Sequence, residues 1–169
     1  MKRFLIGTSL AGMLLAATPA LADGKIYVQL PDLSGLSGQE AEEFLHQLVL
    51  ANVVSSNCEG FEVTDAEWSL LTDSADIVGK GILGLDSAKF DDDYYGPAFA
   101  ALDEDGTCQI EGPQVEPVLE YLVDQGGSRD PLPDQEAAYI EWRALQDYWD
   151  GGGKGMPETA APAGKSKTK

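Results

Sequence analysis

Apolar residues recur every three or four positions along much of this chain, which is the spacing of helices that bury one face. The first such pattern predicts a helix over residues 38–54. Ser37 and Glu40 stand at its start with the spacing of a capping box, in which the two side chains satisfy free amide groups of the first turn. Its apolar face consists of Phe44, Leu45, Leu48 and Val49.

A second helix follows the same design. Thr64 and Glu67 repeat the capping-box spacing, and the glycines at 79 and 81 are expected to end the helix. Its predicted buried face consists of Trp68, Leu71, Ala75 and Val78. Farther on, Asp86 can cap a third helix that runs to Tyr94, and Pro97 is expected to open a separate helix over 98–102.

The last third of the chain predicts two more helices. One begins near Pro113 and is closed by the Gly126–Gly127 pair, and the other begins at Asp134. The apolar face of this final helix consists of Ala138, Trp142, Leu145 and Trp149. One extended segment, over 26–30, precedes all the helices. We therefore expect an all-α domain, a small bundle of five or six short helices closed by one disulfide.

The N-terminal 22 residues have the three parts of a secretory signal. Lys2 and Arg3 precede an uncharged apolar stretch, Pro19 breaks it, and Ala20 and Ala22 supply the small residues of a cleavage site. The alternative, a membrane anchor, is disfavoured because the apolar stretch is shorter than the ~20 residues that span a bilayer. No later stretch could span a membrane either. The sequence thus predicts a periplasmic or secreted protein without membrane insertion.

Composition divides the rest of the chain into two parts. Residues 23–150 hold 28 of the 29 acidic residues and five basic ones, a formal net charge of −23. Such a charge repels nucleic acid and anionic lipid, so neither is an expected partner. Residues 151–169 carry a net charge of +3 and almost no large apolar side chain. They predict a flexible basic tail, with folding back on the acidic body as the alternative.

Two cysteines, Cys58 and Cys108, predict one structural disulfide in an exported protein. They are too far apart for a CxxC redox pair, and one histidine, His46, leaves too few ligands for zinc. Closing a loop of this length stabilises a fold by roughly 4 kcal/mol in the chain-entropy model. We expect the bond to join the start of one helix to the start of another.

Candidate chemistry is sparse, and we expect neither an enzyme nor a cofactor. His46 is the one side chain that could serve a Ser-His-Asp arrangement, and its helical position favours a partly exposed residue without a catalytic role. The runs Asp91–Asp93 and Asp103–Asp105 could gather ligands for calcium, but the second does not fit the EF-hand loop. Solvated helix ends and turns explain both runs, and we assign no metal site.

The final helix offers a candidate interaction face made of Tyr139, Trp142, Tyr148 and Trp149, because Trp and Tyr are favoured at protein interfaces. Burial in the core is the other explanation of this aromatic group. Trp149 lies next to the tail, so exposure is the alternative to burial at this position.

The segment Asn57–Trp68 resembles the HdeA/HdeB family of periplasmic acid-stress chaperones. The resemblance rests on Cys58, Glu59 and Phe61, followed by Asp65 and an aromatic residue at the next helix start, and on the two-cysteine helical architecture. It implies an exported helical protein that binds unfolded or partner proteins in acid through apolar surface. This chain is longer at both ends than that family and more acidic. The alternative is a structural or interaction protein without chaperone activity, with a bound cation as one variant.

Overall fold

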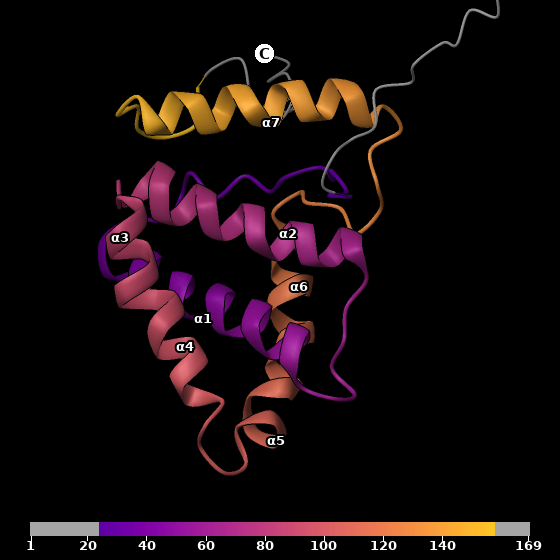
Figure 1. The fold of residues 1–169 in the computed structure, drawn as a ribbon. Helices are drawn as coiled ribbons and strands as arrows, with labels where there is room; N and C mark the ends of the chain where they lie inside the picture. The colour runs from indigo at the N-terminus through magenta and orange to yellow at the C-terminus, as the bar shows by residue number, and fades with distance from the viewer. Residues whose placement is uncertain (1–23, 158–169) are drawn as a thin grey trace, which may run out of the picture.

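The computed structural model describes residues 24–157 and is all-helical, with one disulfide (Figure 1). The predicted signal segment 1–22, residue 23 and the chain from residue 158 onward lie outside the described residues. The α-helices are α1 (Gly38–Asn57), α2 (Asp65–Asp76), α3 (Ser87–Phe90), α4 (Gly96–Ala101), α5 (Thr107–Glu111), α6 (Val115–Asp124) and α7 (Gln135–Asp150). The prediction of a small all-α bundle closed by one disulfide is confirmed.

Several of these helices run into one another without a break. The π-helical turn η1 (Ile77–Ile82) extends α2, a second π-helical turn, η2 (Asp91–Tyr95), joins α3 to α4, and the 3-10 turn η3 (Gly112–Gln114) joins α5 to α6. The described residues thus form five continuous helical segments, at the lower end of the predicted five or six.

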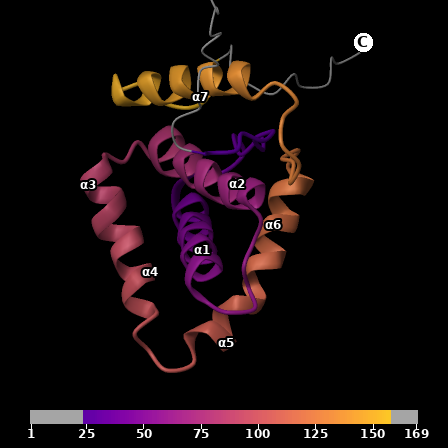
Figure 2. The same cartoon turned by 45° about the vertical axis from the view of Figure 1, so that its right-hand side comes forward.

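Helix α1 lies at the centre of the molecule. In Figure 2 it stands between α4 on one side and α6 on the other, with α2 crossing above it. Leu45, Leu48, Val49 and Val54 of α1 are fully buried, because this helix meets neighbours on most of its circumference. Helix α7 lies across α2 as an outer layer, with the N-terminal segment 24–33 running between the two helices (Figure 1).

The N-terminal segment is extended, as predicted, and it pairs with the chain before α7. An isolated antiparallel β-bridge joins Val28 to Pro131, the amide of Leu132 donates to the carbonyl of Tyr27, and the amide of Ser128 donates to the carbonyl of Gln29. No strand occurs among residues 24–157. The segment acts as a spacer whose buried Tyr27 and Val28 fill the gap beneath α7.

The two predicted capping boxes have opposite outcomes. At α2, the Thr64 hydroxyl accepts from the Glu67 amide and the Glu67 carboxylate accepts from the Thr64 amide, so both halves are present. At α1, Ser37 makes no side-chain capping bond, and that prediction was wrong. Gly38 follows with φ at +53°, a conformation that turns the chain between Ser37 and the first amides of the helix.

The helix predicted to open at Pro97 is present as α4, with Pro97 in its first turn, but no break in helical structure precedes it. The turn before Pro97 widens: the Gly96 amide donates to the Asp91 carbonyl five residues back. A wider turn accommodates the proline ring, which in an ordinary α-helix clashes with the carbonyl four residues earlier. The helical structure that continues α2 ends at Ile82, near the predicted glycines, and Phe90 and Trp149 pack closely against Gly79 and Gly81.

The first part of the predicted flexible tail is packed against the body. The Gly155 amide donates to the Gly81 carbonyl, the Trp149 indole donates to the Gly155 carbonyl, and the Tyr148 hydroxyl donates to the Lys154 carbonyl. Met156 packs against the core. Residues 151–157 therefore fold back on the acidic body, the alternative to a solvated tail.

Candidate functional site

A groove of about 730 Å³ lies along one face of α1. Helix α6 forms its opposite wall, and α5 with η3 closes one end. A volume of this size lies in the usual range of ligand and peptide sites. The lining residues are Leu36, Glu40, Glu43, Phe44, Gln47, Leu50, Ala51, Ile110, Glu111, Gln114, Pro117, Val118 and Tyr121. We refer to this surface as the α1/α6 groove.

The floor of the α1/α6 groove is apolar. Phe44 and Val118 are nearly buried, and the ring of Tyr121 meets that of Phe44 edge-on with centroids 4.7 Å apart. Ile110 stands at the closed end with 65 % of its surface exposed, although it is a large aliphatic side chain. Exposed apolar groups gathered in a concave surface are typical of sites that bind other molecules.

The rim of the groove carries negative charge. Glu40 and Glu43 project from α1 and Glu111 from α5, while the polar Gln47 and Gln114 complete the edge. No lysine, arginine or histidine occurs among the lining residues, all of which lie in the described part of the chain. The groove thus combines an apolar floor with an anionic edge.

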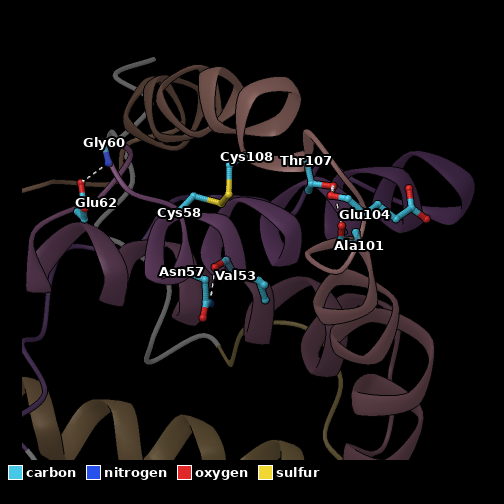
Figure 3. Close-up of a disulfide and its surroundings, with 9 residues drawn as sticks. All are labelled: Val53, Asn57, Cys58, Gly60, Glu62, Ala101, Glu104, Thr107 and Cys108. Carbon is cyan, nitrogen blue, oxygen red and sulfur yellow. Dashed lines mark hydrogen bonds between the residues drawn. A yellow bond between two sulfur atoms is a disulfide. The ribbon is translucent and has the colours of Figure 1, made fainter.

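A disulfide fixes the closed end of the groove. Cys58 and Cys108 are bonded, with their Cα atoms 5.5 Å apart (Figure 3). Cys108 lies in the first turn of α5, as expected, but Cys58 is the C-terminal cap of α1, so the predicted position at a helix start was wrong for Cys58. Because Ile110 and Glu111 follow Cys108 by two and three residues, the bond holds one wall of the groove against α1.

Two further contacts secure α5. The Thr107 hydroxyl donates toward the carbonyls of Ala101 and Glu104, which ties α5 to the preceding turn (Figure 3). On the other side, the ring of Phe61 packs against Gly112 at the start of η3. Both cysteines and Phe61 therefore belong to one cluster beside the groove, although none of the three lines it.

A second polar cluster lies beneath α7. The Lys25 ammonium pairs with the buried Asp73 carboxylate and lies 4.0 Å from the centroid of the Trp142 ring, whose indole nitrogen also donates to Asp73. Burial raises the pKa of Asp73, and the opposing attraction of Lys25 does not cancel this effect. This cluster joins the N-terminal segment, α2 and α7, and its role is to dock the outer layer.

A third cluster holds α2 to α6. Arg129 pairs with Glu116 and with Glu67, which also accepts the capping bond from Thr64. Burial raises the pKa of Glu67, but the bonds from Thr64 and the charge of Arg129 together outweigh it, so the net pKa is lowered. The folded state therefore favours the ionised form of this carboxylate.

The four aromatic residues of the candidate interaction face do not share one exposed surface. Trp149 is 6 % exposed, which agrees with burial in the core and not with the alternative of exposure, and Trp142 packs on Lys25. Tyr139 and Tyr148 are each more than one-third exposed. For these two tyrosines the interaction role stays a prediction, whereas the two tryptophans attach α7 to the body.

The other candidate residues are dispersed. His46 is exposed on α1, where its ring lies 4.5 Å from that of Tyr94. Asp91–Asp93 lie in η2 and Asp103–Asp105 in the turn before α5, and within residues 24–157 no three acidic, histidine or cysteine side chains converge on a metal-sized site. None of the helices between residues 24 and 157 has the length and apolar content of a membrane span.

Sequence analysis did not find the α1/α6 groove. Glu40, Glu43, Gln47 and Leu50 recur at helical spacing on α1, which is a detectable signal for one exposed face. The opposite wall lies about 60 residues farther along the chain and depends on tertiary structure. Comparisons of the chain with protein-family models, with curated proteins and with solved structures found no match.

Proposed function

We propose that this chain is an exported helical binding protein that holds apolar segments of other proteins in the α1/α6 groove. The single observation that carries the proposal is Ile110, a large aliphatic side chain that is 65 % exposed at the closed end of an apolar floor. A disulfide holds it there, and an oxidising compartment such as the periplasm or the cell exterior permits that bond.

Acid-stress chaperone activity is the specific form of this function that the resemblance to the HdeA/HdeB family favours. The structure supplies one supporting feature. Acid removes the charge that Glu67 presents to Arg129, which weakens the link between α2 and α6. This change increases the surface offered to unfolded clients.

The test measures aggregation of an acid-labile client at about pH 3 and at about pH 7, in the presence and absence of the protein. Light scattering should be suppressed in acid. Ile110→Ser removes the exposed anchor of the groove, and Ile140→Ser is the matched control because Ile140 is 61 % exposed on α7. The first variant should lose protection and the second should retain it.

Two results would contradict the proposal. If the wild-type protein itself precipitates in acid and protects no client, the proposed chaperone activity is rejected. If both isoleucine variants lose protection equally, general surface hydrophobicity is the cause and the groove is not the binding site. Circular dichroism at about pH 7 should confirm that both variants keep the helical fold, as expected for two exposed positions.

A further inference from the structure

The charge and shape of the α1/α6 groove define a partner more narrowly than apolar binding does. The lining residues of α1 recur at positions 40, 43, 44, 47, 50 and 51, so the groove follows one helical face for about three turns, or about 16 Å. Helix α6 runs along the other side with Pro117, Val118 and Tyr121. A groove that follows one helical face for this length matches one amphipathic helix, which offers anchors at i, i+3 or i+4 and i+7.

The edge of the groove determines which helix fits. Glu40 and Glu43 stand on the α1 side and Glu111 stands at the closed end, with no basic lining residue to compensate them. The domain around them, residues 23–150, has a formal net charge of −23. An anionic or neutral helix would dock against uncompensated negative charge, whereas lysine or arginine on both flanks of an apolar stripe would meet three carboxylates.

We infer that, near neutral pH, the α1/α6 groove docks a cationic amphipathic helix of a partner protein or peptide. This inference rests on the proposed function, which assigns binding to the same groove, and it adds the charge and helical form of the occupant. The apolar face of the partner covers Phe44, Leu50 and Ile110, and its basic flanks lie against the glutamates. Long-range attraction from the acidic domain accelerates the encounter.

The test uses the oxidised full-length mature chain and three designed peptides of about 14 residues, long enough for three to four turns. All share one apolar stripe, and their polar faces carry lysine, glutamine or glutamate. Fluorescence anisotropy at about pH 7 should show binding of the lysine peptide at least about tenfold tighter than the glutamine peptide, with the glutamate peptide weakest. Raising salt from about 50 mM to about 500 mM should reduce this preference.

Matched variants locate the effect. One triple variant combines Glu40→Gln, Glu43→Gln and Glu111→Gln. It should bind the lysine peptide about tenfold more weakly than the wild-type protein does and bind the glutamine peptide with unchanged affinity. The control is the triple variant Glu59→Gln, Glu104→Gln and Glu136→Gln, which removes the same charge from exposed sites outside the groove. It should change affinity less than threefold, because screening weakens distant charges.

Several outcomes would overturn the inference. Equal affinity for the three peptides would show that the groove does not select its partner by charge. An equal loss of lysine-peptide affinity in the two triple variants would show the same. Dimerisation that Ile110→Ser abolishes, without peptide binding, would assign the groove to a second copy of the chain. The client assay in acid reports separately on the proposed function. If client protection depends on Ile110 but the lysine peptide is not preferred at neutral pH, only this inference is rejected. If the protein neither protects the client nor prefers the lysine peptide, the inference and the proposed function are both rejected.

Discussion

The ring of Phe61 lies so close to Gly112 that a Cβ atom on residue 112 would stand 2.3 Å from a ring carbon. No side chain fits there without movement of the ring or of η3. Phe61 belongs to the segment after Cys58, and Gly112 follows Cys108 by four residues, so this contact and the disulfide secure the same junction. The position of the groove's closed end depends on both.

Gly112→Ala should therefore destabilise the protein by about 1–3 kcal/mol, the usual cost of overpacking a filled site. Thermal unfolding followed by circular dichroism would measure the effect as a melting temperature lower by several degrees. Gly35→Ala is the control, because a Cβ there meets nothing within 4 Å and the backbone is not in the left-handed region. Equal melting temperatures for the two variants would show that the Phe61 contact is not tight.

Removing the disulfide by Cys58→Ser with Cys108→Ser should lower the free energy of unfolding by roughly 4 kcal/mol, because the unfolded chain regains the entropy of a 50-residue loop. Urea titration of the variant and of the wild-type protein with and without reductant would measure it. Binding of the lysine peptide should fall as well, since Ile110 and Glu111 lose their covalent link to α1. A variant as stable as the wild type contradicts a structural role for the bond.

Lys25→Met should destabilise the protein by about 3 kcal/mol at neutral pH, because it leaves the Asp73 carboxylate buried without its cation. Burial already raises the pKa of Asp73 in the folded state. The penalty is therefore present above the folded-state pKa and is relieved as pH falls through it, since the folded state then takes up the proton more readily than the unfolded chain. Urea unfolding curves at several pH values should show that the difference in free energy of unfolding between Lys25→Met and the wild-type protein becomes smaller in acid.

The control for this prediction is Lys89→Met. Lys89 is exposed on α3, so its loss should change stability by less than about 0.5 kcal/mol at any pH. A Lys25→Met penalty that stays constant as pH falls would show that Asp73 does not titrate in the folded protein over the measured range.

Glu67→Gln should also differ most from the wild-type protein at neutral pH, although the pKa shift behind the difference has the opposite sign. Glutamine retains the capping geometry at α2 but loses the charge that pairs with Arg129, so we expect a cost of about 1 kcal/mol at neutral pH. The pKa of Glu67 is lowered in the folded state, so the wild-type advantage is present above the unfolded-state pKa and is lost as pH falls through the folded-state pKa. Melting curves of both proteins should converge in acid. A stability difference between the two proteins that widens as the pH is lowered would contradict a lowered pKa for Glu67 in the folded state.

Local signals predicted most of this fold. The bond pattern at Thr64 and the side-chain caps at Asp86 and Asp134 need a few neighbouring residues, and all three occur where the sequence places them. The capping box predicted at Ser37 is absent because the backbone at Gly38 adopts a positive φ, which a glycine permits but does not require. Pro97 lies in the first turn of α4, as predicted, but the widened turn before it removes the expected break between the two helices.

The site was harder to predict because its parts are distant in the chain. Cys58 and Cys108 indicated that two segments meet, but not that an exposed Ile110 and Leu50 would line one groove together with three glutamates. The aromatic residues of α7 show the converse problem. Their periodicity did not distinguish Trp149, buried against the returning chain, from Tyr148, whose ring remains partly exposed.

The return of residues 151–157 onto the body makes this short glycine-rich segment a cover for the end of α7. A recombinant chain that stops at Asp150 would lose the carbonyl that receives the Trp149 indole bond and the backbone link to Gly81. Water would then reach the tryptophan ring, and the end of α7 would fray. A shortened chain for binding or labelling work should therefore retain residues 151–157.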